Sequence, residues 1–157
     1  MQTQPITVEL QLPGLRVIGV REDAWVIEVA AEYETEEEAC PHCGQPTRAV
    51  HDARAQRKHD LELWEKPACL LLWKRRFRCR PCRKVFTEDD PVCGRRRRTT
   101  RRLRQRIAVQ AEEATVRTVA QWHRVSEGFV QRSWLEAHSV IQAPARPQAV
   151  RRCFQPF

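Results

Sequence analysis

The chain has 157 residues, with 28 Lys and Arg against 20 Asp and Glu, and its formal net charge is +8. Residues 1–39 carry two Arg against nine acids, whereas residues 40–157 carry 26 basic against eleven acidic residues, so a polyanion is expected to bind the second part. No apolar run approaches the roughly 18 residues that a bilayer span needs, and the N-terminus has no export-signal pattern. These features predict a cytoplasmic protein that has no membrane partner and contains one ordinary domain or two or three very small ones.

The first predicted element is a β-hairpin in residues 15–33, where two β-rich runs flank a polar turn at residues 21–23. One face of the hairpin is expected to carry the apolar side chains of Trp25, Ile27 and Val29. The other face is expected to carry Glu28 and Glu32. The acidic residues 34–38 are expected to be a solvated connector. Residues 1–38 are therefore interpreted as an N-terminal hairpin with an acidic connector.

Two Cys-x-x-Cys pairs follow, Cys40 with Cys43 and, further along, Cys79 with Cys82. Two residues between thiolates allow both sulfurs of a pair to reach one metal ion, and two pairs complete a closed tetrahedral shell. A strand-rich unit of about 50 residues also buries too little surface to fold well without such a metal. The spacing therefore predicts one structural zinc ion in a zinc ribbon at residues 39–92, and two redox-active or buried cysteine pairs are the alternative.

The remaining cysteines and the nearby histidines are weaker metal ligands. Cys69 is expected in the core, and Cys93 and Cys153 are expected to be free thiols. His42, His51 and His59 have the chemistry to coordinate zinc, but surface positions are expected for them. Gly44 suits the tight turn after the first pair, because glycine tolerates positive φ.

Residues 68–79 are predicted to form a half-buried strand. The side chains expected to face inward are Trp73, Phe77 and Cys79. Those expected on a basic outer face are Lys74, Arg76 and Arg78.

Eight arginines lie within twelve residues directly after the strand-rich part: Arg95, Arg96, Arg97, Arg98, Arg101, Arg102, Arg104 and Arg106. Like charges at this density repel one another unless a polyanion neutralises them, and the guanidinium group matches phosphate with two hydrogen bonds. No acidic residue lies between Asp90 and Glu112, as an ordinary solvated helix face would have. The segment is therefore predicted to bind phosphate.

Three helices are predicted in residues 95–138. A basic helix capped by Thr99 or Thr100 is followed by helices at residues 115–122 and 126–138, with a short break at residues 123–125. Apolar residues expected in their core include Leu103, Ile107, Val119, Trp122, Phe129, Val130 and Trp134. This order is typical of a helix-turn-helix module whose last helix enters the major groove, and a helical hairpin that packs on a protein is the alternative.

In such a module Ser126 caps the last helix, and the residues that point away from its apolar face include Glu127, Gln131 and Arg132. Gln131 has the geometry to read adenine and Arg132 to read guanine. The turn lacks the glycine that is common there. Residues 139–157 are rich in proline and are expected to form an irregular tail.

The order CPHCG, RKHDL, RRFRC, CRKVFTE and RRTTRRL, followed by the helices, resembles the N-terminal region of ISL-three-type bacterial insertion-sequence transposases from Cys40 to His138. The predicted elements together give an α+β fold with a small β-hairpin and zinc-ribbon unit before a three-helix helix-turn-helix module. The resemblance implies zinc on Cys40, Cys43, Cys79 and Cys82. The basic and helical part is then implied to bind double-stranded DNA at terminal inverted repeats.

Transposases of that family continue into a catalytic domain with an acidic triad, for which residues 139–157 leave no room. The aspartates are Asp23, Asp52, Asp60, Asp89 and Asp90, all upstream of the helices. We therefore expect a truncated or frameshifted copy that is not an enzyme, has no small-molecule substrate and is associated with the bacterial nucleoid when bound to DNA. The expected protein partners are a second copy or an intact transposase. The alternatives are an RNA-binding or protein-interaction module, or a transposase subunit completed by a separate catalytic polypeptide.

Overall fold

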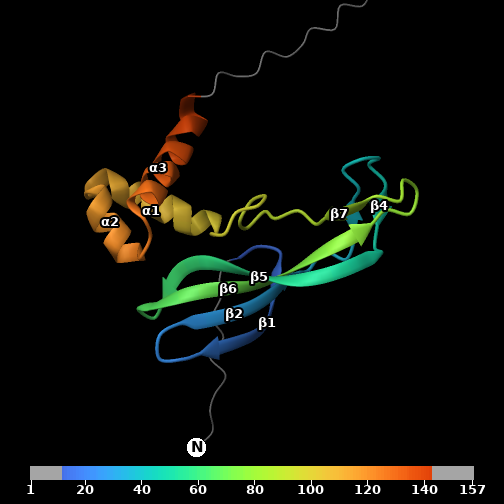
Figure 1. The fold of residues 1–157 in the computed structure, drawn as a ribbon, viewed down its shortest axis with the longest axis horizontal. Coiled ribbons are helices and arrows are strands. Elements are labelled where there is room, and N and C mark those ends of the chain that lie inside the picture. The colour runs from blue at the N-terminus through green and yellow to red at the C-terminus, as the bar shows by residue number, and fades with distance from the viewer. Residues whose placement is uncertain (1–11, 143–157) are drawn as a thin grey trace, which may run out of the picture. The chain divides into compact units, whose positions relative to one another are not determined.

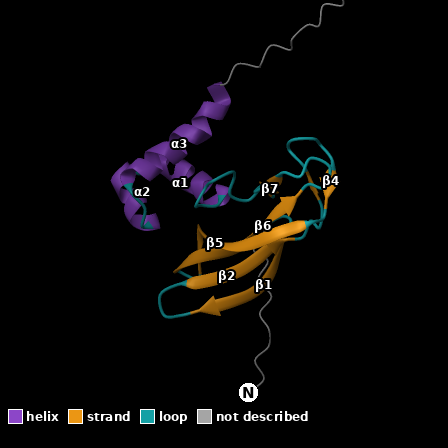
Figure 2. Ribbon diagram, turned by 45° about the vertical axis from the view of Figure 1, so that its right-hand side comes forward, coloured by secondary structure: helices purple, strands orange, loops and turns teal. Residues whose placement is uncertain are grey.

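The structure, a computed structural model, describes residues 12–142, and the chain divides into two compact units, Met1–Leu103 and Arg104–Phe157. The described strands precede the described helices along the chain, and Figure 2 shows the strands in orange and the helices in purple. The strands are β1 (Leu15–Glu22), β2 (Ile27–Tyr33), β3 (Glu38–Ala39), β4 (Pro46–Thr47), β5 (Val50–Leu63), β6 (Lys66–Arg78) and β7 (Val85–Thr87), and the helices are α1 (Arg101–Glu113), α2 (Val116–His123) and α3 (Glu127–Gln142). The fold is thus α+β, as the sequence predicted. No helix among residues 12–142 has the length and apolar character to cross a bilayer.

Five strands of the first unit form one mixed sheet in which β1, β2, β6 and β5 are neighbours in that order (Figure 1), and β7 also pairs with β6. β1 and β2 form the predicted antiparallel hairpin. β2 and β6 run parallel, with Ile27 opposite Ala68. Because of this pairing, the N-terminal hairpin and the long strands that follow it belong to the same sheet. β3 and β4 form a separate two-stranded sheet.

The core of the first unit lies on one face of the five-stranded sheet. Its buried cluster is Ile27, Val29, Ala31, Tyr33, Leu70, Leu72, Val92 and Cys93. Alternate residues of β2 point to this face, as the period of a strand requires, and their neighbours on β6 are buried with them. The segment after β7 supplies the last two members, so the predicted thiol Cys93 is a core residue.

Trp25 does not lie on the inward face that the sequence predicted for it. It is 82% exposed, whereas Ile27 and Val29 are buried as predicted. Trp25 belongs to the turn before β2, because the Asp23 carboxylate accepts hydrogen bonds from the N–H groups of Trp25 and Val26 at 2.7 and 2.8 Å. These two hydrogen bonds close the turn and leave the indole outside the strand.

Two neighbouring residues of β6 have the opposite orientation to the prediction. Lys74 is 4% exposed and Trp73 is 39% exposed. The Lys74 amine is satisfied inside the protein, because it donates to the backbone oxygens of Glu88 and Asp89 at 3.1 and 2.6 Å. At the end of the strand, Phe77 and Cys79 are buried and Arg78 is exposed, as predicted.

The second unit, with the start of α1, contains the three helices, each with one fully buried apolar side chain: Ile107, Val119 and Val130. Thr100 is the predicted cap of α1, because its hydroxyl accepts a hydrogen bond from the Leu103 N–H at 3.3 Å. Thr115 caps α2 in the same way through the N–H of Thr118. Side-chain contacts also link α1 to the other helices: Gln110 with His123, and Glu112 with His138 at 3.2 Å.

The chain changes direction between α2 and α3 without a glycine in the turn. Arg124 adopts the left-handed conformation, with φ 52° and ψ 42°, that glycine usually takes at the end of a helix. The N–H of Val125 then donates to the Ala120 oxygen at 3.0 Å. The Ser126 hydroxyl accepts from the Phe129 N–H at 3.3 Å, so Ser126 caps α3 as predicted.

α3 extends beyond its predicted end. It reaches Gln142, so the first residues of the predicted irregular tail, 139–142, are helical. The rest of that tail, with Cys153, lies outside the described residues.

Two tryptophans that were predicted in the helical core are exposed instead. Trp122 is 52% and Trp134 is 36% exposed, while Val119 and Val130 fill the buried positions. The Trp134 ring stacks on His138, with ring centroids 4.1 Å apart. Trp134 therefore packs along the surface of its own helix.

Candidate metal centre and nucleic-acid interface

The four cysteines of the predicted zinc site meet at one place, although they come from two distant parts of the chain. Cys40 directly follows β3 and Cys79 directly follows β6. Cys40 Sγ lies 3.6 Å from Cys82 Sγ, Cys43 Sγ lies 3.4 Å from Cys79 Sγ, and all four sulfurs lie within 4.8 Å of one another. The two pairs therefore form one cluster.

Backbone hydrogen bonds shape each pair into a knuckle. In the first, the Cys40 N–H donates to the Gln45 oxygen at 2.9 Å, and the Gly44 N–H donates to the Cys40 oxygen at 2.8 Å. Gly44 has φ 71°, so the positive φ predicted for it is present. In the second knuckle the Cys79 N–H donates to the Lys84 oxygen at 2.9 Å.

The donor set fits a structural zinc ion. Tetrahedral zinc with Zn–S bonds of about 2.3 Å places its sulfurs about 3.8 Å apart, close to the observed separations. Four thiolates fill the tetrahedral shell and leave no open position for a substrate. Cys40, Cys43, Cys79 and Cys82 thus form a site for one structural zinc ion, as the sequence predicted.

Before a metal ion binds, the thiols of the cluster differ in acidity. Burial raises the pKa of Cys40, but hydrogen bonds from the backbone of His42 and Cys43 and from neighbouring thiols outweigh it and lower the pKa to about 7. At Cys79 the Cys82 backbone lowers the pKa, yet burial and the neighbouring sulfurs raise it to about 12. Zinc must therefore displace protons from this cluster when it binds.

The other candidate ligands lie apart from the cluster. Cys69 and Cys93 are buried, and no histidine in the described part of the chain belongs to the four-cysteine group. His42, His51 and His59 are exposed, as expected for surface residues. The N–H of His59 donates to the Arg98 oxygen at 2.8 Å. The His59 backbone thus helps to hold the basic segment beside β5.

The eight arginines of the predicted phosphate-binding segment fall into two groups. Those exposed to solvent are Arg95, Arg96, Arg97, Arg98, Arg101 and Arg106. Arg102 instead donates through Nε to Asp60 Oδ1 at 2.7 Å and through Nη2 to Asp60 Oδ2. Arg104 is buried, with its Nε 3.6 Å from a Glu136 carboxylate oxygen. Arg102 and Arg104 therefore have structural partners inside the fold, whereas the other six arginines are exposed at the surface.

Asp60 also organises the start of α1. The hydroxyl of Thr100, the residue that caps α1, donates to Asp60 Oδ1 at 2.7 Å. The Thr100 N–H donates to the His59 oxygen at 3.0 Å. Asp60 thus holds both Thr100 and Arg102 against β5. These contacts fix the start of α1, directly after the exposed arginines at residues 95–98.

The residues predicted to read bases lie on the first turns of α3. Glu127, Gln131 and Arg132 are exposed, whereas Val130 is fully buried. Gly128 and Phe129 are half-buried. The three polar side chains therefore lie on the surface of the helical unit, as an interface would require.

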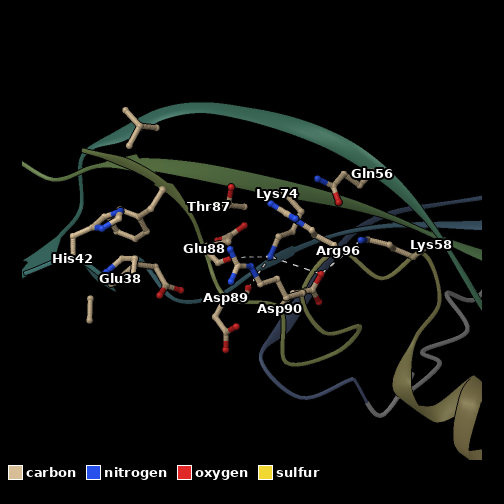
Figure 3. Close-up of a pocket in the computed structure, with 15 residues that line it drawn as sticks. Glu38, His42, Gln56, Lys58, Lys74, Thr87, Glu88, Asp89, Asp90 and Arg96 are labelled. Carbon is tan, nitrogen blue, oxygen red and sulfur yellow. Dashed lines mark hydrogen bonds and ion pairs between the residues drawn. The ribbon is translucent and has the colours of Figure 1, made fainter. Parts of the chain in front are cut away.

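A buried charged cluster in the first unit was missed by the sequence analysis (Figure 3). Asp90 Oδ2 lies 3.7 Å from Lys58 Nζ and 3.9 Å from Lys74 Nζ, and all three side chains are buried. They line a cavity of about 780 Å³ with Glu38, Gln56 and Arg96. Burial lowers the pKa of Lys74, although Asp90 opposes this shift. Lys58 also donates to the Arg97 oxygen at 2.5 Å, so the cluster supports the basic segment.

The burial of Lys58 is visible only in the strand register. Lys58 lies opposite Leu70 on the core face of the sheet, and Lys74 follows Leu70 and Leu72 at alternate positions of β6. Lys58 lies in no apolar alternating pattern, whereas Lys74 continues the alternation of Leu70 and Leu72. The burial of Lys58 therefore depends on which strands pair.

Comparison with known proteins agrees with this geometry. Residues 36–82 match the family model described as the zinc-finger of transposase IS204/IS1001/IS1096/IS1165. The matched region contains all four clustered cysteines, so the chain carries a zinc ribbon of the transposase type with one structural zinc site. No curated protein and no solved structure matches the chain.

Proposed function

We propose that the chain binds double-stranded DNA sequence-specifically, as the DNA-recognition part of an insertion-sequence transposase that acts in the bacterial nucleoid. One observation carries this proposal: a transposase-type zinc ribbon at residues 36–82 is followed in the same chain by six exposed arginines between residues 95 and 106. Such a density of exposed positive charge is stable when phosphates neutralise it. The proposed target is the terminal inverted repeat of the element.

The exposed arginines are suited to phosphate contacts. Within the described residues, no carboxylate forms an ion pair with Arg95, Arg96, Arg98, Arg101 or Arg106. Arg96 has φ 58°, a conformation that costs stability in any residue with a Cβ atom. Strained residues of this kind occur often at binding sites. If all six exposed arginines contact phosphates, the logarithm of the affinity falls with the logarithm of salt concentration at a slope of roughly −5.

Helices α2 and α3 are proposed to act as a helix-turn-helix, with α3 in the major groove. The exposed positions of Gln131 and Arg132 near the start of α3 support this role. Their side chains make paired hydrogen bonds with adenine and guanine, respectively. Glu127 can accept a hydrogen bond from cytosine in the same way.

In this proposal the chain recognises DNA and does not cut it. A two-metal nuclease needs free carboxylates held close together. Three of the five aspartates have structural partners instead: Asp52 with Arg76 at 3.1 Å, Asp60 with Arg102, and Asp90 with Tyr33 at 2.7 Å. Any cleavage would then come from a partner, either an intact transposase or a separate catalytic polypeptide.

The test is a selection of bound sequences from random duplex DNA with the zinc-loaded chain. We expect a defined site to be enriched, with Arg101→Ala weakening every sequence to a similar extent and Arg132→Ala mainly relaxing the preference at one position. Affinity that does not change between low and physiological salt contradicts the proposal. Structured RNA that outcompetes duplex DNA would favour the RNA-binding alternative.

A protein-interaction role is the second candidate, and an apolar hollow of about 390 Å³ in the helical unit favours it. The hollow is lined by Ala111, Val116, Val130, Gln131, Trp134 and Leu135. The proposed occupant is a second copy of the chain or an intact transposase. Sedimentation of the chain alone tests the first case, and a dimer that Leu135→Ala converts to monomer supports it.

A further inference from the structure

The second zinc knuckle carries three arginines around one surface hollow. Arg78 is the last residue of β6, Arg80 follows Cys79, and Arg83 follows Cys82. Together with Ala49 and Cys79 they line a hollow of about 340 Å³. All three arginines are exposed.

These guanidinium groups differ from the arginines beside them. On β6, Arg75 pairs with Glu88 at 2.8 Å and Arg76 pairs with Asp52 at 3.1 Å. In the part of the chain that the structure describes, Arg78, Arg80 and Arg83 pair with no carboxylate, and the hollow has no acidic residue in its lining. Apart from the zinc thiolates beside it, the hollow is therefore a concentrated positive site with no carboxylate counterion.

The backbone of Arg83 has a feature in common with the first knuckle. Arg83 occupies the position after Cys82 that Gly44 occupies after Cys43 in the first knuckle, and both have positive φ, 58° and 71°. Glycine adopts this conformation without strain, whereas a residue with a Cβ atom loses stability there. In the first knuckle the positive φ is therefore taken by a glycine without strain. In the second knuckle it is taken by Arg83, whose guanidinium group lines the hollow. Strained residues cluster at functional sites, although Trp64, Glu65 and Arg124 also have positive φ in this chain, so the site is inferred from the three exposed guanidinium groups and the hollow.

Guanidinium groups bind phosphate oxygens with paired, charge-assisted hydrogen bonds. We propose that Arg78, Arg80 and Arg83 on the second zinc knuckle form a binding site for a backbone phosphate of duplex DNA, separate from the Arg95–Arg106 segment. The choice of DNA as the source of the phosphate rests on the proposed function. The site itself requires only phosphate chemistry, so a free phosphate ion is the other source.

The decisive variant is Arg83→Gly in the full, zinc-loaded chain, because it removes one guanidinium group and also the backbone strain. We expect the melting temperature to stay equal or rise and the zinc content to remain one per chain. Binding to a random-sequence duplex should weaken, with a log–log salt slope shallower by about 0.9 for this variant and by about 2 to 3 when Arg78→Ala and Arg80→Ala are added. These results together would separate binding from folding.

Arg21→Ala is the matched control for charge. Arg21 is exposed in β1 and pairs with Glu28, which keeps a second partner in Arg57 at 2.9 Å. Its loss changes the net charge by the same amount without touching the hollow, so the wild-type slope is expected. A slope for Arg83→Gly equal to that of Arg21→Ala overturns the proposal. Loss of zinc from Arg83→Gly also overturns it, because Arg83 would then serve to balance the charge of the zinc thiolates.

Arginine side-chain NMR signals distinguish the two sources of phosphate. Titration with a short duplex should shift the Nε–Hε signals of Arg78, Arg80 and Arg83, and inorganic phosphate at matched ionic strength should shift them more weakly. Shifts with inorganic phosphate in a chain that binds no duplex would retain the phosphate site but overturn both its assignment to DNA and the proposed function. Duplex binding that depends on Arg101 while these three signals stay unchanged would retain the proposed function and overturn the knuckle site.

Discussion

The hydroxyl of Tyr33, the last residue of β2, donates a hydrogen bond of 2.7 Å to Asp90 Oδ1 in the segment after β7. The same carboxylate oxygen accepts the Cys93 N–H at 2.9 Å. The Lys74 amine lies 4.7 Å from the centre of the Tyr33 ring and 3.9 Å from Asp90. Asp90 therefore ties the segment that leads into Arg95 to the core face of the sheet.

Tyr33→Phe should lower the free energy of unfolding by about 1.5–3 kcal/mol, because the change removes a buried hydrogen bond to a charged group. Chemical denaturation of the zinc-loaded chain measures this. Trp25→Phe is the control, since Trp25 is highly exposed, and a change within about 0.5 kcal/mol is expected for it. Equal changes in the free energy of unfolding for the two substitutions would show that the Tyr33 hydrogen bond does not contribute to stability.

The ionisation of Tyr33 should report on folding at high pH. Burial, followed by the hydrogen bond to Asp90, raises the pKa of Tyr33 well above its ordinary value. The neutral phenol is favoured in the folded state, so its contribution to stability is complete below the unfolded pKa of about 10 and is lost as the pH rises beyond it. Tyr33 is the single tyrosine, so tyrosinate absorbance follows this group alone. Tyrosinate that forms at the ordinary pKa in a still-folded chain would contradict this expectation.

Removal of zinc should unfold the zinc ribbon. Four thiolates that lose their metal are left as a crowded cluster of thiols, and metal binding supplies much of the folding free energy of such small units. Elemental analysis should find one zinc per chain in the wild type and in His42→Ala, because His42 is exposed and lies outside the cluster. Cys79→Ser should lose the metal and the circular dichroism of the folded sheet. Full zinc content after replacement of both Cys43 and Cys79 would refute the four-cysteine site.

Features that depend on nearby residues were predictable from the sequence. The zinc ligands followed from the two-residue spacing within each cysteine pair, and the starts of two helices followed from the caps predicted at Thr99 or Thr100 and at Ser126. In each case the interacting groups of a knuckle or cap lie within a few residues of one another. Local spacing therefore determined these elements.

Features that depend on distant residues were not predictable. Lys74 is buried because β2 pairs in parallel with β6 and because the backbone oxygens of residues 88 and 89 accept hydrogen bonds from its amine. Arg102 has a structural partner because Asp60, 42 residues away, lies beside it. An alternating pattern does not specify which distant strand or carboxylate will be adjacent. The sequence therefore located the arginine cluster but not which of its members are engaged in the fold.

Neighbouring arginines of α1 should respond differently to the same substitution. Arg102→Ala leaves the largely buried Asp60 carboxylate without its guanidinium partner, and a loss of about 1–3 kcal/mol in unfolding free energy is expected. Arg101→Ala should leave stability within about 0.5 kcal/mol and make the salt slope of duplex binding shallower by about 0.9. Denaturation and salt-dependent binding measured on both variants check this. An Arg102→Ala variant as stable as Arg101→Ala would mean that the Asp60 contact does not support the fold.

Arg124→Gly should stabilise the helical unit. Arg124 adopts φ 52° in the turn before α3, and replacing a strained residue by glycine relieves about 1 kcal/mol, although glycine also gains freedom in the unfolded chain. Arg132→Gly is the matched control, because it makes the same chemical change inside a helix, where glycine costs about 1 kcal/mol. Thermal denaturation of the zinc-loaded chain should therefore move the two variants in opposite directions. A lower melting temperature for Arg124→Gly would show that contacts of the Arg124 side chain outweigh the strain of its backbone.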